Sequence, residues 1–106
     1  MNKYILKVMR YIDNPDLFTS EDMQSNVYDA ASDSRIATRI ATRMAANAAN
    51  AAYTANAANA ANATYTAYTA NAANATNAAA YYAIDWYFKR TGEDKERYNN
   101  EVERLR

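Results

Sequence analysis

The sequence predicts an all-α protein, and three observations support this prediction. Alanine, the strongest helix former, supplies 25 of the 106 residues. The chain has a single Pro and a single Gly, the residues that interrupt helices most reliably, and neither occurs between residues 19 and 91. Apolar residues also recur at helical spacing near both ends. We therefore expect one all-helical domain over residues 1–106, with a short N-terminal helix, a long Ala- and Asn-rich helical segment and a short C-terminal helix.

The N-terminal helix is predicted from apolar residues at positions i, i+3, i+4 and i+7. These residues are Ile5, Val8, Met9 and Ile12. Asn2 precedes them as a suitable N-cap. Pro15 disfavours a helical conformation for the residue before it, so we expect this helix to end near Asp13.

A second helix is predicted to begin at Thr19 or Ser20. Thr19 is a good N-cap, and acidic residues follow it in the first turn. Phe18 can then pack against Met23 as a hydrophobic staple. The Ser-Asp-Ser sequence at residues 32–34 offers a break and a further N-cap before the chain continues as helix.

Residues 45–77 form a strict repeat of three, in which two small residues precede Asn or Tyr. The third positions are Asn47, Asn50, Tyr53, Asn56, Asn59, Asn62, Tyr65, Tyr68, Asn71, Asn74 and Asn77. A period of three does not match the 3.6 residues of an α-helical turn, so the Asn stripe rotates around the helix and defines no fixed face. The high Ala content still predicts α-helix throughout this segment.

An unbroken helix over residues 33–90 would be about 90 Å long and would bury almost nothing alone. Two arrangements solve this problem: a hairpin that turns near residues 62–64, or a long rod that pairs with a second chain. Ala-rich faces let helices approach closely and Asn tolerates turn geometry, so we favour the compact hairpin.

If the helix were unbroken, several large side chains would share one amphipathic seam. They are Tyr28, Ile36, Ile40, Tyr53, Tyr65, Tyr68, Tyr82 and Trp86. Because the triplets rotate Asn around the helix, we also expect some Asn side chains to lie inside a helix–helix interface, where an amide without partners costs about 1–3 kcal/mol.

The long segment has a clear predicted end. Lys89 and Arg90 suit the negative end of a helix dipole, and Gly92 suits the left-handed C′ position. A last helix is predicted from about Glu93. Its apolar face consists of Tyr98, Val102 and Leu105.

Charge and composition exclude several classes of function. Twelve basic residues balance twelve acidic ones, so no net field attracts nucleic acid. Residues 44–84 carry no charge, but eight Asn residues among them argue against a membrane span. The absence of Cys and of an apolar leader predicts a cytoplasmic protein in a bacterial host cell.

The sequence also lacks the usual equipment for catalysis. There is no His, no Cys and no glycine-rich loop, and the acidic residues cluster near the ends, where capping and solvation explain them. We therefore expect no enzymatic activity, no metal site and no cofactor.

The candidate site residues are therefore residues that would bind a protein partner. An aromatic cluster covers both faces of its helix, so part of it is expected in the core and part at an interface. Its members are Tyr81, Tyr82, Trp86, Tyr87 and Phe88. Asp85 either engages an Arg of a partner or is an ordinary surface acid paired with Lys89. Three arginines one turn apart either bind phosphates or carboxylates or form a solvated basic edge: Arg35, Arg39 and Arg43.

The residues at 7–18 and 83–95, KVMRYIDNPDLF and AIDWYFKRTGEDK, flank the Ala-rich triplets. Together with those triplets they resemble small alanine-rich helical proteins of bacteriophages and bacterial mobile elements, some of which are labelled as immunity proteins. The resemblance spans nearly the whole chain and assigns no site residues. A second resemblance is to alanine-rich helical antifreeze proteins, which present Thr at eleven-residue spacing. Here the two Thr residues of each pair are 22 residues apart, and a Tyr occupies the position midway between them. The pairs are Thr42 and Thr64, with Tyr53 between them, and Thr54 and Thr76, with Tyr65 between them.

The leading hypothesis is a non-enzymatic protein–protein interaction protein of phage or mobile-element origin, an inhibitor or immunity-type protein that binds a host or toxin protein. We expect a protein partner, with a homo-oligomer as a further possibility, and neither nucleic acid nor a membrane. The alternative is a structural or surface-active repeat helix, such as an ice-binding protein.

Overall fold

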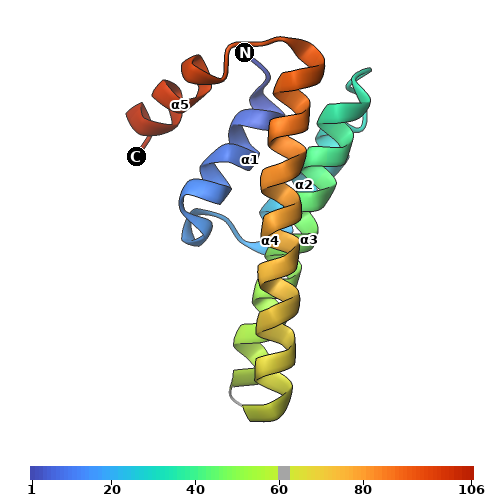
Figure 1. The fold of residues 1–106 in the computed structure, drawn as a ribbon, viewed down its shortest axis with the longest axis vertical. Coiled ribbons are helices and arrows are strands. Elements are labelled where there is room, and N and C mark those ends of the chain that lie inside the picture. The colour runs from blue at the N-terminus through green and yellow to red at the C-terminus, as the bar shows by residue number, and fades with distance from the viewer. Residues whose placement is uncertain (60–62) are drawn as a thin grey trace.

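The computed structural model describes residues 1–59 and 63–106, and the side chains of residues 1–52 and 74–106. Over these residues it contains five α-helices, one short 3₁₀ helix and no strand (Figure 1). The elements are α1 (Lys3–Asp13), η1 (Pro15–Leu17), α2 (Ser20–Ala30), α3 (Ile36–Asn59), α4 (Ala63–Thr91) and α5 (Lys95–Arg104). The predicted all-α class is confirmed.

Helix α1 has the predicted ends and the predicted buried face. The Asn2 side chain accepts hydrogen bonds from the backbone N–H groups of Tyr4 and Ile5, at 3.0 and 3.3 Å. The helix ends at Asp13, and Asn14 is extended because Pro15 follows it. The predicted apolar residues lie in the core or pack against it: Ile5, Val8, Met9 and Ile12.

Helix α2 begins with the predicted N-cap. Thr19 and Asp22 form a capping box, in which each side chain bonds the backbone N–H of the other residue. Met23 is fully buried, and Phe18 packs against the same core. The helix ends at Ala30, so the break predicted at residues 32–34 is confirmed.

Helices α3 and α4 lie side by side, as the hairpin arrangement predicts (Figure 1). The protein measures 44 × 27 × 21 Å, about half the length that an unbroken rod requires. The compact arrangement of the helices is therefore confirmed, and the described residues do not form a single rod. Of the residues predicted to turn, Ala63 and Thr64 are the first two of α4, and Asn62 lies outside the described residues.

The core combines aliphatic side chains from α1, α2, α4 and α5 with small side chains and aromatic rings. Helix α3 contributes an alanine face whose members are all buried: Ala37, Ala41, Ala45, Ala46, Ala48 and Ala49. The rings that fill the remaining space are Tyr11, Tyr87, Phe88 and Tyr98. The Phe88 ring packs edge-on against its two tyrosine neighbours, Tyr87 and Tyr98, at centroid distances of 5.2 and 5.0 Å.

The predicted seam of large side chains is wrong where the structure describes it. Tyr28, Ile36, Tyr82 and Trp86 are exposed, and Ile40 packs against the core. The side chains of the other three members, Tyr53, Tyr65 and Tyr68, lie outside the described residues. The seam assumed one unbroken helix, but the chain changes direction after Ala30 and again between α3 and α4, so a shared helical face is not preserved across these breaks. The helices pack through alanine instead.

The described Asn residues of the triplets do not enter the core. Asn47, Asn50 and Asn74 are exposed, and Asn77 is half-buried. Around Asn47 and Asn50, α3 buries its alanines, whereas Ala75 and Ala78 beside the Asn residues of α4 are exposed. The other Asn side chains of the triplets lie outside the described residues, and the prediction of buried amides stays untested there.

The C-terminal end of α4 follows the predicted pattern. The helix ends at Thr91, with Lys89 and Arg90 in its last turn, and Gly92 has a φ of 70°. Helix α5 begins two residues later than predicted because Asp94, and not an earlier residue, caps it. Helix α5 packs against α1 through Tyr98 and Val102, which are both buried.

Candidate protein-binding surface

Helix α4 divides the predicted aromatic cluster between the core and the surface. Tyr87 and Phe88 are buried. Tyr81, Tyr82 and Trp86 remain exposed by 58%, 75% and 37%. This division follows from helical geometry, since residues 80, 83, 84, 87 and 88 share the buried side of the helix. The prediction that only part of the cluster belongs to the core is confirmed.

Tyr82 and Trp86 lie one turn apart, with Arg90 on the following turn, and we call these three residues the aromatic face. The Arg90 guanidinium lies 5.1 Å from the centroid of the Trp86 ring, a cation–π arrangement that holds a positive charge beside the indole. Lys89 is exposed next to it. The aromatic face therefore combines two exposed rings with a basic edge.

Tyr81 and Asp85 line a cleft bounded by α1, α4 and α5. Asp85 forms an ion pair with Lys95 of α5, at 3.0 Å, so the predicted pairing with Lys89 is wrong. The turn at Gly92 brings the start of α5 back alongside Asp85. Both charged side chains are about half exposed, and such a surface pair contributes about 1 kcal/mol at most.

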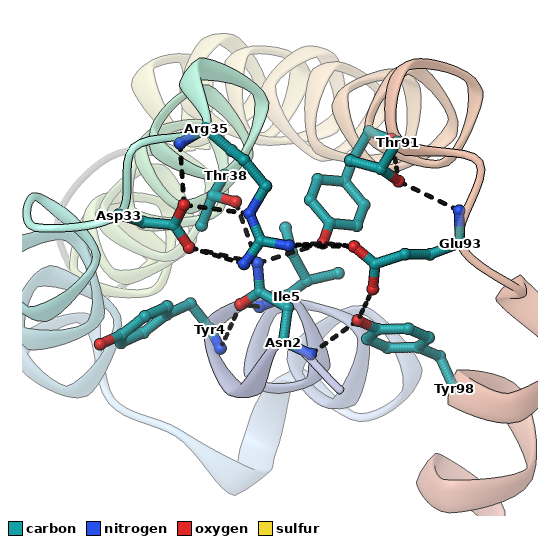
Figure 2. A network of polar contacts seen from close by, with 10 residues as sticks. Asn2, Tyr4, Ile5, Asp33, Arg35, Thr38, Thr91, Glu93 and Tyr98 are labelled. Atoms are coloured by element: carbon teal, nitrogen blue, oxygen red, sulfur yellow. Dashed lines mark hydrogen bonds and ion pairs between the residues drawn. The ribbon is translucent and has the colours of Figure 1, made fainter.

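The three predicted arginines have different environments. Arg39 and Arg43 are exposed and form no ion pair within the described part of the chain. Arg35 instead makes a two-pronged contact with Asp33, at 3.1 and 3.0 Å, and its third nitrogen bonds Glu93 at 3.1 Å (Figure 2). Arg35 is therefore occupied within the protein, and only Arg39 and Arg43 fit the solvated basic edge.

Figure 2 shows that Arg35 belongs to a polar network where the N-terminus meets the ends of α3, α4 and α5. We call this network the polar clasp, with the members Asn2, Asp33, Arg35, Thr38, Tyr87, Glu93 and Tyr98. The Glu93 carboxylate accepts hydrogen bonds from the hydroxyls of Tyr87 and Tyr98, one on each oxygen. Its backbone N–H bonds the Thr91 hydroxyl at 3.3 Å, which positions it after Gly92.

The clasp changes the acidity of its members. Burial raises the pKa of Glu93, but the hydrogen bonds from Tyr87 and Tyr98 and the charge of Arg35 outweigh burial and hold that pKa below its ordinary value. Burial and the bond to Glu93 raise the pKa of Tyr87, and the same two causes raise that of Tyr98. At neutral pH the carboxylate is therefore charged and both phenols are neutral.

The chemistry of the clasp suits a structural role. Each donor faces an acceptor, and no buried side-chain polar atom within the described residues lacks a hydrogen-bond partner. Across the same residues no group of acidic side chains is arranged to hold a metal ion. The aromatic face and the cleft beside it are accessible from outside the protein.

Sequence reasoning missed the clasp. Asn2 was recognised as a helix cap, but its contacts with α3, α4 and α5 were not predicted. One feature of the sequence could have drawn attention to Glu93. It directly follows Gly92, the only Gly of the chain, where a turn is expected to redirect the backbone. Its meeting with Arg35 depends on how four chain segments converge, and no local pattern encodes that.

Comparisons with known protein families, with curated proteins and with solved structures find no match. The resemblances to phage and mobile-element proteins and to antifreeze proteins therefore stay predictions. None of the helices, over the residues that the structure describes, combines the length and the apolar character needed to cross a membrane.

Proposed function

We propose that this protein is a non-catalytic binding protein that engages another protein through the aromatic face of α4. One observation carries the proposal. Tyr82 and Trp86 stand at the surface of a protein in whose core alanine is the most frequent residue.

The energetic contrast is large. A buried tyrosine or tryptophan removes about 150–250 Å² of surface from water, and each Å² of apolar surface contributes about 25 cal/mol. An alanine in the core buries a much smaller apolar area and therefore contributes far less free energy to folding. A sequence short of large apolar groups nevertheless leaves Tyr82 exposed by 75% and Trp86 by 37%, and the exposed parts of these rings contribute nothing to the core. Tyr, Trp and Arg are also the residues that dominate binding energy at protein interfaces.

The charges beside the rings define the partner. Arg90 and Lys89 supply a basic edge next to Trp86, with no acidic side chain paired to either within the described residues. A complementary partner surface has an apolar pocket with carboxylates at its rim. The resemblance of residues 83–95, which include Trp86 and Arg90 of the aromatic face, supplies the finer class: an inhibitor or immunity-type protein of phage or mobile-element origin that binds a host or toxin protein.

The experiment is capture of a partner from a bacterial host lysate on immobilised protein. The test variant is Tyr82→Ala, and the matched control is Tyr28→Ala, which removes a tyrosine of nearly equal exposure, 73% against 75%, from α2. We expect one stoichiometric partner that wild type and Tyr28→Ala retain and that Tyr82→Ala loses. Repeated failure to recover any stoichiometric partner, or equal capture by both variants, counts against the proposal.

The ice-binding alternative has less support than the protein-binding proposal, because Thr42 lies in the protein interior. Thr42 is fully buried, so the pair formed by Thr42 and Thr64 offers no flat face to ice. Thr76 is half-buried, and the side chains of Thr54 and Thr64 lie outside the described residues. Thermal hysteresis with ice shaping would support this alternative, and freezing like a serum-albumin control would remove it.

A further inference from the structure

The cleft between α4 and α5 has an apolar interior. Its apolar lining comes from Met9 and Ile12 of α1, Ile84 of α4 and Val102 of α5, and Tyr81 of α4 and Asn99 of α5 also line it. Its volume is about 350 Å³, at the lower end of the range of about 300–1,000 Å³ typical of ligand sites. Such a volume suits one small apolar group.

Ion pairs connect α5 to both of the other walls of the cleft. Asp85 of α4 bonds Lys95 at the start of α5, at 3.0 Å, and Asp13 at the end of α1 bonds Arg106 at the C-terminus, at 2.6 Å. All four of these charged residues line the cleft. Each positive charge is already matched by a negative one. The remaining charge of the lining, Glu103, is exposed to solvent.

We propose that this cleft receives one uncharged apolar side chain of the protein partner, an aromatic ring or a branched aliphatic group. The inference rests on the proposed function and adds the anchor that the partner supplies. A charged group entering the cleft would lose water. An anion would find both positive charges of the lining already paired, and a cation would find only the solvent-exposed carboxylate of Glu103 outside the ion pairs, so the entry of either is unfavourable. An apolar group loses nothing of this kind and gains contacts with Met9, Ile12, Ile84 and Val102.

The position of the cleft supports the same occupant. Tyr81 and Asp85 on its wall directly precede Tyr82 and Trp86 of the aromatic face, so the cleft and the aromatic face lie on one helix at the same height. A partner seated on the aromatic face is therefore within one helix width of the cleft. Interfaces concentrate their binding energy where an anchor side chain fills such a pocket.

The first test uses toluene as the probe and needs no partner. In protein with ¹³C-labelled methyl groups, we expect toluene to shift the NMR signals of Met9, Ile12, Ile84 and Val102 saturably. Benzoate and benzylammonium carry the same ring with a charge, and we expect both to bind at least about tenfold more weakly. Absence of saturable shifts, or equal binding of the charged probes, overturns the proposal.

A pair of adjacent substitutions shows whether the probe occupies this cleft. Asn99→Phe places a ring in the cleft from α5, whereas Asn100→Phe adds the same ring at the next residue, which is exposed and does not line the cleft. We expect Asn99→Phe to abolish the toluene shifts and Asn100→Phe to leave them within about twofold. Melting temperatures of both variants close to wild type exclude unfolding as the cause. Toluene binding that survives Asn99→Phe contradicts the assignment.

The same two variants separate this inference from the proposed function. With the partner captured on the aromatic face, Asn99→Phe is expected to weaken its binding at least about tenfold and Asn100→Phe is expected to leave it unchanged. A partner that binds Asn99→Phe at full strength but is lost with Tyr82→Ala overturns the anchor and leaves the aromatic face standing. Toluene binding in the cleft without any recoverable partner would defeat the proposed function, and the partner anchor with it.

Discussion

The side-chain amide of Asn2 donates a hydrogen bond to the hydroxyl of Tyr87, 85 residues further along the chain, at 3.1 Å. The same amide reaches Thr38 on α3 at 3.0 Å, and the Asn2 backbone N–H reaches the Tyr98 hydroxyl on α5 at 2.7 Å. Because Asn2 also caps α1, one residue connects four helices. The polar clasp therefore holds the end of the helical bundle from which α5 departs.

Asn2→Ala is expected to lower the free energy of unfolding by about 2–3 kcal/mol. Loss of an N-cap costs about 1 kcal/mol, and loss of the hydrogen bonds to the hydroxyls of Tyr87 and Thr38 adds about 1–2 kcal/mol. Urea unfolding followed by circular dichroism measures the change. Asn100→Ala, at an exposed position of α5, is the control and should remain within about 0.5 kcal/mol of wild type. An equal effect of the two substitutions would show that the clasp contributes nothing.

Glu93→Gln is expected to destabilise the protein at neutral pH and to matter less in acid. Its folded pKa lies below the ordinary value of 4.5, so the stability it contributes is present above that pH and is lost as pH falls through the folded pKa. At pH 7 we expect a loss of about 1–3 kcal/mol, because the bonds from Tyr87 and Tyr98 become weaker.

The measurement is a series of urea unfolding curves between pH 7 and pH 3. The difference between wild type and Glu93→Gln should shrink as the pH falls below about 4.5. Glu103→Gln, at an exposed position, serves as the control and should show no such convergence. A difference that stays constant across this range would mean that the charge of Glu93 does not stabilise the fold.

Local signals in the sequence predicted most of the helix boundaries. The cap at Thr19, the stop at Gly92 and the extended residue before Pro15 are each determined by neighbours within a few residues, and each is confirmed. Local signals do not determine which residues pack against a given helical face, because this depends on where the chain reverses direction. The seam through Tyr28, Ile36 and Tyr82 failed for this reason.

The sequence predicted which residues belong to the candidate site, but not which contacts they make. Helical spacing correctly predicted that the aromatic cluster covers both faces of its helix and that only part of it is buried. It did not identify the buried rings, since residues 81 and 88 are seven apart and lie on one face, yet Tyr81 is exposed and Phe88 is buried. It could not place Arg35 beside Glu93 or Lys95 beside Asp85. These contacts are made across the turn at Gly92 or between helices distant in sequence, where spacing along the chain carries no information.

Ala45→Leu is expected to destabilise the protein by about 1–3 kcal/mol. Ala45 is fully buried, and a larger side chain there would force apart helices that approach closely through alanine. Thermal unfolding measures the loss. Asn47→Leu adds a leucine at an exposed position of the same helix and should change stability by less than about 0.5 kcal/mol. Equal stability of Ala45→Leu and wild type would show that the alanine face is not closely packed.

The most direct test of the aromatic face is photo-crosslinking from α4. Tyr82 is replaced by p-azidophenylalanine, which preserves the ring, and the same replacement at Tyr28 of α2 is the control, because the two tyrosines are almost equally exposed. After irradiation in host lysate, we expect position 82 to give one adduct with a different protein, of defined mass, and position 28 to give none. Adducts of equal yield from both positions, an adduct with a second copy of this chain, or no adduct from position 82 would contradict binding of a separate protein partner through the aromatic face.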